Sequence, residues 1–129
     1  MVVVIDPLIA GISGDMLLCS LVDLGADKNK IISGIKESEK FLTNSTIKKI
    51  DFQKIQKKGV QSIQLILEID EDVHERKGSE IKKAIIESVN ILELSKKGKI
   101  FAESCIATLI SSESKIHGVP EESVHFHEA

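Results

Sequence analysis

Two neighbouring segments in the middle of the chain alternate apolar and polar residues, and this pattern limits the possible folds more than any other feature. In residues 60–69 every second position from Ile63 to Ile69 is apolar, and residues 46–56 show a looser form of the same period. Because side chains along a β-strand point alternately to its two faces, both segments are predicted to be strands with one apolar face. The stretch 57–59 between them predicts an antiparallel hairpin, whose register stays open because the usual two-residue turn sequences are absent.

Helical patterns flank the hairpin on both sides. Apolar residues recur at helical spacing in four segments, which begin after Ser13, after Asp27, at Ser79 and after a break at 96–99. Ser13 and Asp27 are typical N-cap residues, and Gly118 is a typical helix stop. We therefore expect two helices before the hairpin and two after it.

The two ends of the chain resemble strands. Residues 2–5 are β-branched and are followed by Asp6 and Pro7, and a proline cannot continue a central ladder, so a short strand ending at Asp6 is predicted. Residues 124–128 alternate again and predict a last strand. The order of elements predicts an α+β fold with a small mixed sheet of three to four strands, helices on one face and a ferredoxin-like split β-α-β core.

Composition narrows the classes of function. The chain has 129 residues, which fits one domain over 1–129, and 17 Lys and Arg against 20 Asp and Glu give a net charge of −3. This charge, with four Phe as the only aromatic residues, disfavours a nucleic-acid partner. No apolar stretch approaches the roughly 20 residues of a membrane span. Without a basic leader or a cleavage site, a cytoplasmic location is expected.

The tail holds the sharpest candidate for chemistry. His125 and His127 are two residues apart, and in a strand such side chains share a face about 6.6 Å apart, from which two imidazoles can converge on one metal ion. Two exposed histidines of an edge strand explain the spacing equally well. Glu128 would point with Phe126 to the opposite face unless the strand ends or bulges there.

A second candidate region lies near the N-terminus. Asp6 ends the predicted first strand, where ligands bind in sheets with crossover helices, and Asp15 lies in the first turn of the next helix. With Gly11 and Gly14 they frame a loop whose N–H groups could hold an anion while the carboxylates hold a cation. The simpler interpretation is that Asp15 complements the helix dipole and Asp6 merely ends a strand. The Gly-Lys-Ser/Thr ending of a P-loop is missing.

Three motifs in order along the chain together resemble the LarC-type nickel-insertion proteins, which make the nickel-pincer cofactor of lactate racemase. They are Gly-Ile-Ser-Gly-Asp-Met at 11–16, Leu-Gly-Ala-Asp at 24–27, and His-Gly at 117–118 leading to Val-His-Phe-His-Glu at 124–128. The resemblance implies the N-terminal portion of a CTP-dependent chelatase or cyclometallase, of the lyase class. That enzyme inserts nickel into a pyridinium bisthiocarboxylate mononucleotide.

The resemblance also implies cofactors and partners. Family members carry a C-terminal domain to which nucleotide binding is attributed, so CTP is expected only with that domain, and the chain is not expected to catalyse alone. The implied partners are this C-terminal domain and the nickel-pincer cofactor precursor, and a homo-oligomer is also compatible. Ni²⁺ is the implied metal, with Mg²⁺ or Mn²⁺ as a second ion.

The implied site follows from these motifs. Ni²⁺ accepts imidazole and carboxylate ligands. In this interpretation His125 and His127 hold nickel, Asp15, Asp6 or Glu128 complete the sphere or hold Mg²⁺, and Gly11, Ser13 and Gly14 contact a phosphate. Relatives commonly carry a histidine-rich run after the hairpin, whereas residues 70–76 contain one histidine, so nickel storage is not expected there.

Two other functions stay open. The chain could be a structural or interaction domain that docks on the C-terminal domain without binding metal, and an exposed apolar patch would favour this. Convergence of His125 and His127 on Asp15 would favour nickel handling. A phosphohydrolase that uses Asp6 and Asp15 ranks last, because no further carboxylate or lysine motif accompanies them.

Overall fold

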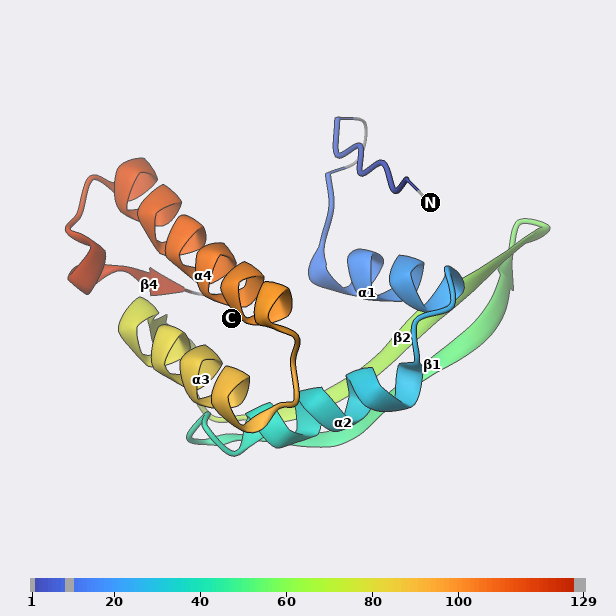
Figure 1. Cartoon of the computed structure of the whole chain (residues 1–129), viewed down its shortest axis with the longest axis horizontal. Helices are drawn as coiled ribbons and strands as arrows, with labels where there is room; N and C mark the ends of the chain where they lie inside the picture. Colours follow the sequence, from blue (N-terminus) through green and yellow to red (C-terminus); the bar gives the residue numbers. More distant parts are fainter. Residues whose placement is uncertain (1, 9–10, 127–129) are drawn as a thin grey trace.

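The structure is a computed structural model that describes residues 2–8 and 11–126. Figure 1 shows a long hairpin with two helices along it, and a pair of helices beside its base. The elements are α1 (Gly14–Asp23), α2 (Lys28–Glu39), β1 (Ser45–Lys57), β2 (Val60–Glu71), β3 (Arg76–Lys77), α3 (Gly78–Ile91), α4 (Lys96–His117), the 3₁₀ turn η1 (Glu121–Ser123) and β4 (His125–Phe126). The α+β class is confirmed.

The predicted hairpin is present as β1 and β2, which pair antiparallel. The turn consists of Lys58 and Gly59, with φ of 51° and 82°. Two successive residues with positive φ are the geometry of a type I′ turn, which matches the twist of the strands it joins. Lys58 adopts the left-handed conformation without being glycine, which is why the sequence carries no usual turn signature.

A β-bulge keeps the apolar face of the hairpin continuous. The register shifts between Ile47 and Lys49, so Lys48 is an extra residue on β1. The extra residue changes the alternation, and Ile47, opposite Ile69, therefore faces the same side as Ile50, opposite Leu67. This apolar face is the one that the helices cover.

Helices α1 and α2 pack against β2 and β1 respectively. The predicted cap of α2 is confirmed, because the Asp27 carboxylate accepts from the backbone N–H of Asn29 at 2.9 Å and of Lys30 at 3.3 Å. An ion pair of 3.2 Å between Lys28 and Asp51 ties the start of α2 to β1. α2 also contacts α3 and so links the hairpin to the second pair of helices.

The best-buried core lies between α3, α4 and the segment before β4. Ile106, Ile110 and Val124 are 3%, 4% and 2% exposed, and Phe126 packs against them. α4 starts earlier than predicted, because the Ser95 hydroxyl caps it by accepting from the N–H of Gly98 at 3.1 Å. The predicted break at 96–99 is therefore the first turn of the helix. Its predicted end is confirmed, with Gly118 left-handed at φ 64°.

The second sheet is small. β3 and β4 pair antiparallel, with Arg76 opposite Phe126 and Lys77 opposite His125. The N–H of Gly78 donates to the carbonyl of Val124 at 2.8 Å, and this hydrogen bond continues the contact. The described part of the predicted tail strand is thus confirmed, and residues 127–129 lie outside the described part of the chain.

The sheet differs from the prediction in two respects. Its strands form two separate two-stranded antiparallel sheets, so the described residues contain neither a mixed sheet of three to four strands nor a ferredoxin-like core. Residues 2–5 form no strand, and Val2 and Val4 are 89% and 83% exposed. β-Branched residues favour an extended backbone, but a strand also needs a partner, and no described strand pairs with this run.

Candidate functional site

His125 is held on β4 by its two neighbours. Val124 is buried and Phe126 packs against the same core, so the alternation of the strand turns His125 to the opposite face. Its side chain is 38% exposed. The imidazole is therefore offered to solvent from a backbone that the core fixes on both sides.

A carboxylate that the sequence did not indicate lies beside this imidazole. Oε1 of Glu75 is 3.8 Å from Nδ1 of His125. Glu75 directly precedes β3, in the loop that sequence reasoning set aside for its single histidine. Because the two residues meet only through the pairing of β3 with β4, no local signal in the sequence could have found the contact.

Arg76 anchors β3 from the inside. Its side chain is 2% exposed, and the guanidinium donates to Oε1 of Glu71 at 2.9 Å, to Oε1 of Glu80 at 2.7 Å and to the carbonyl of Thr43 at 2.7 Å. These contacts join the base of the hairpin to α3. They fix the backbone from which Glu75 projects.

The N-terminal candidates form local turns. One carboxylate oxygen of Asp6 accepts from the N–H of Leu8 at 3.0 Å, and the N–H of Gly11, at φ 69°, donates to the carbonyl of Pro7 at 2.9 Å. Asp6 thus closes a turn, and it does not end a strand.

Asp15 lies at the start of α1 next to Gly14. Its carboxylate accepts from the Ser13 hydroxyl and from the N–H of Met16, the latter at 2.9 Å. These hydrogen bonds, first that of Ser13, hold the pKa of Asp15 below 3.8. Ser13 is the predicted N-cap by position, although its side chain makes no cap hydrogen bond. Asp15 is therefore an anion at neutral pH.

The structure does not bring the two candidate regions together. Figure 1 shows α1 above the hairpin and β4 beside α3 and α4, with part of α4 between them. Within residues 2–8 and 11–126, no three His, Cys, Asp or Glu side chains are grouped so as to hold one metal ion. Asp6 and Asp15 thus form no described cluster with His125. His127 and Glu128 lie outside the described residues.

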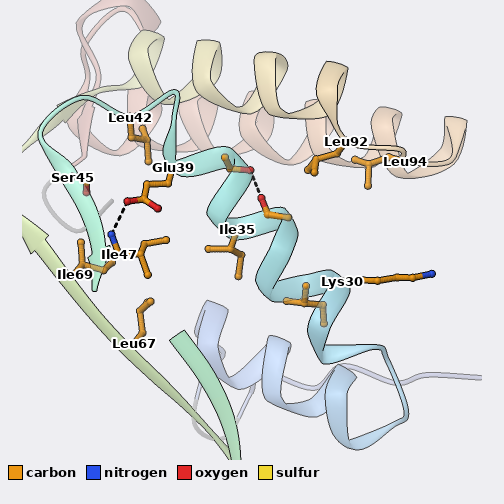
Figure 2. A pocket seen from close by; sticks show the side chains of 13 residues that line it. Lys30, Ile35, Glu39, Leu42, Ser45, Ile47, Leu67, Ile69, Leu92 and Leu94 are labelled. Carbon is orange, nitrogen blue, oxygen red and sulfur yellow. Dashed lines mark hydrogen bonds between the residues drawn. The ribbon is translucent and has the colours of Figure 1, made fainter. Parts of the chain in front are cut away.

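An apolar pocket lies elsewhere, between α2, the hairpin and the link from α3 to α4 (Figure 2). It measures about 580 Å³. Ile35, Ile47 and Leu67 point into it, while Glu39 accepts from the N–H of Ile47 at 2.8 Å and Lys30 extends away. Its lining suits an apolar partner and not an ion. Over the same described residues no helix has the length and apolar character needed to cross a bilayer.

Several known proteins are similar to the chain. The chain is 37% identical over 121 residues to a protein of Staphylococcus epidermidis, and the match covers 92% of the chain and 28% of the relative. For proteins of Geobacillus kaustophilus and Akkermansia muciniphila the identities are 34% and 32%, with 92% of the chain and 29% of each relative covered. All three are called pyridinium-3,5-bisthiocarboxylic acid mononucleotide nickel insertion protein. No solved structure matches the chain.

The extent of the match differs between the chain and its relatives. The chain spans less than a third of the length of these relatives, at 28% to 29%. A family model described as nickel insertion protein matches residues 3–129, which is nearly the whole chain. The chain therefore belongs to the nickel insertion protein family.

Proposed function

We propose that this chain is the N-terminal metal-handling part of a protein that inserts nickel into the pyridinium bisthiocarboxylate mononucleotide precursor of the nickel-pincer cofactor. In this role Ni²⁺ is cargo that the segment at β4 holds before transfer. The observation that carries the proposal is the outward imidazole of His125, fixed between the core residues Val124 and Phe126. The name that the Staphylococcus relatives carry supports the choice of metal and substrate.

The chemistry of the tail suits nickel. We assign His125 and His127 as the imidazole ligands, with Glu128 as an oxygen ligand. Imidazole and carboxylate sites bind Ni²⁺ more tightly than Mn²⁺ or Co²⁺, while Zn²⁺ competes. A site of few, partly exposed ligands also suits a carrier, because cargo must leave again.

The N-terminal loop takes the second role in the proposal. Gly11, Ser13 and Gly14 contact the phosphate of the mononucleotide, and Asp6 and Asp15 hold Mg²⁺ or Mn²⁺ against it. The Asp15 carboxylate is held at the start of α1 by hydrogen bonds from Ser13 and from the N–H of Met16, and carboxylate oxygens are the ligands that Mg²⁺ prefers. The start of α1 adds favourable N–H groups for an anion.

Residues 1–129 act in this proposal as one domain of a longer architecture in the cytoplasm. The C-terminal domain is its partner, and it supplies CTP binding and the lyase-class chemistry. The share of the relatives that the chain covers supports this division.

Calorimetric titration of Ni²⁺ tests the metal site. The double variant His125→Ala/His127→Ala is expected to weaken Ni²⁺ binding by at least about tenfold, because each imidazole is a ligand. His117→Ala is the control, since His117 lies at the end of α4 and pairs with Glu113 at 3.2 Å, and this variant should bind Ni²⁺ as tightly as the unchanged chain. Circular dichroism verifies folding. Equal affinities of the double variant and the unchanged chain would remove these histidines from the site.

The apolar pocket favours a second candidate, an interaction domain that docks on the C-terminal domain and binds no metal. Leu67 and Ile69, which line the pocket, are 43% and 48% exposed. This candidate is preferred if the chain takes up no Ni²⁺ but binds a separately produced C-terminal domain, and if Leu67→Asp abolishes that binding.

A further inference from the structure

We infer that Glu75 is a direct ligand of the nickel cargo and forms, with His125, a two-armed seat across the β3–β4 ladder. The inference rests on the proposed nickel holding at β4 and adds the oxygen ligand of that site. It places the oxygen donor on the loop before β3, among the described residues, and not on the N-terminal aspartates.

The distance between the two donor atoms fits one ion. Nδ1 of His125 and Oε1 of Glu75 are 3.8 Å apart. Imidazole nitrogens and carboxylate oxygens bind a first-row ion at about 2.0–2.2 Å, so two such atoms on one ion lie roughly 3–3.5 Å apart. A side-chain movement of less than about 1 Å closes this difference. Both side chains are partly exposed, at 38% and 53%, so they can make this movement and an ion can reach them.

The ladder sets the two side chains on one face. Lys77 is the direct partner of His125, and Glu75, two residues before Lys77, shares its face. Glu75 and His125 are thus diagonal neighbours across the ladder, a separation that long side chains span.

The backbone that carries each of the two proposed ligands is held by buried contacts. On one strand the buried contacts of Arg76 hold the backbone next to Glu75. On the other strand Val124 and Phe126 hold His125, and a Cβ added to Gly78 would lie 3.3–3.5 Å from Ile110, Phe126 and Val124. Gly78 thus leaves no space for a larger side chain between the strands, and its N–H donates to the carbonyl of Val124 at 2.8 Å, so the seat is largely formed before the ion arrives.

The charges around the seat make the carboxylate necessary. Lys77 is a cation on the same face and opposes a metal ion, so His125 beside Lys77 would be a poor seat without Glu75. As an ion pair alone, a His–Glu contact at 3.8 Å between partly exposed side chains contributes little to stability.

A second geometry would leave Glu75 outside the coordination sphere. The carboxylate could accept a hydrogen bond from Nδ1–H of His125 and orient the ring, so that Nε2 binds the ion. Glutamine separates the two cases, because its amide oxygen still accepts this hydrogen bond but is a poor nickel ligand. Histidine adds a second test, because it supplies a nitrogen ligand in place of an oxygen ligand and so changes the nickel spectrum only if this side chain binds the ion directly.

The test is a titration of Ni²⁺ at one neutral pH into the full chain and into Glu75→Gln, Glu75→His and Asp72→Asn. Asp72→Asn makes the same charge change in the same loop and is the matched control. We expect Glu75→Gln to weaken binding by about tenfold or more, and Asp72→Asn to keep the affinity within about twofold. Glu75→His should bind within about threefold of the unchanged chain and shift the nickel absorption spectrum, because a nitrogen replaces an oxygen.

The inference is overturned if Glu75→Gln binds Ni²⁺ as tightly as the unchanged chain. It is overturned all the more if Glu75→His then binds weakly, because Glu75 would in that case act only as a hydrogen-bond acceptor. His125→Ala distinguishes this failure from that of the proposed function. If His125→Ala lowers the affinity and Glu75→Gln does not, the inference alone fails. If neither variant lowers it, nickel holding at β4 fails as well.

Discussion

At the scale of single residues, Arg76 shows how a charged side chain can be a core residue. A buried charge is tolerated only when it is paired and its donors are bonded, and Arg76 meets Glu71, Glu80 and the carbonyl of Thr43. Most of the residues at 70–76 are charged, yet the Arg76 side chain is only 2% exposed. The arginine instead joins the base of the hairpin to the start of α3.

Replacing this arginine should therefore cost stability. Arg76→Met is expected to lower the free energy of unfolding by about 2–3 kcal/mol, because two carboxylates lose their shared partner while staying only 28% and 38% exposed. Arg76→Lys should lose less, since it keeps the charge but not the forked donors. Urea unfolding measures both changes. Midpoints equal to that of the unchanged chain would show that the network adds no stability.

At the scale of elements, α2 and β1 are joined by an exposed ion pair whose effect depends on pH. The hydrogen bond from Lys28, and then that from the N–H of Phe52, lower the pKa of Asp51 below 3.8 in the folded chain. A carboxyl whose folded pKa lies below its unfolded pKa stabilises the fold at pH values above the unfolded pKa. That stabilisation is lost as the pH falls through the folded value.

The sign gives a prediction for Asp51→Asn. The variant should melt below the unchanged chain at pH 7, and the difference should shrink at a pH well below 3.8, where the carboxylate becomes protonated. Lys28→Gln should show the same trend, because it removes the other partner. Thermal unfolding in low salt measures the difference. An equal difference at both pH values contradicts the assignment.

The elements also show which parts of the fold are visible in a sequence. The alternation from Ile63 to Ile69 and the Asp27 cap are local signals, and they gave the hairpin and α2 correctly. The pairing of β3 with β4, and the missing partner of residues 2–5, depend on distant segments. Periodicity reports which residues prefer an extended backbone, but not which strand receives them.

The candidate site also has one part that the sequence could predict and one part that it could not. His125 could be predicted to face away from the core, because its alternation with Phe126 is local. Glu75 could not be linked to it, since the two lie on different strands. The expected meeting of Asp15 with the tail required the packing of α1 relative to β4, which no sequence pattern encodes.

At the scale of the whole molecule, burial is uneven. The cluster of Ile106, Ile110 and Val124 lies between α3, α4 and β4. On the hairpin Ile50 and Phe52 are buried, but Leu67 and Ile69 stay 43% and 48% exposed. Most of the stability should therefore come from the half of the molecule that carries His125.

This distribution can be measured with two truncations of similar size. Ile110→Ala is expected to cost about 2–5 kcal/mol, because it opens a cavity at a residue that is 4% exposed. Leu67→Ala should cost about 1 kcal/mol, since much of that side chain is already in water. Denaturant unfolding followed by circular dichroism gives both values. Equal costs would contradict the uneven core.

The placement of His125 between Val124 and Phe126 has a consequence for how such a carrier is controlled. Under the proposed role, the folded core holds β4 in place and thereby positions the His125 imidazole. A partly folded or misfolded chain would therefore not present this ligand. The core side chains Val124 and Phe126 would then be needed both for the chain to fold and for it to bind nickel. Nickel binding would thus depend on complete folding, and no additional regulatory element would be required for this dependence.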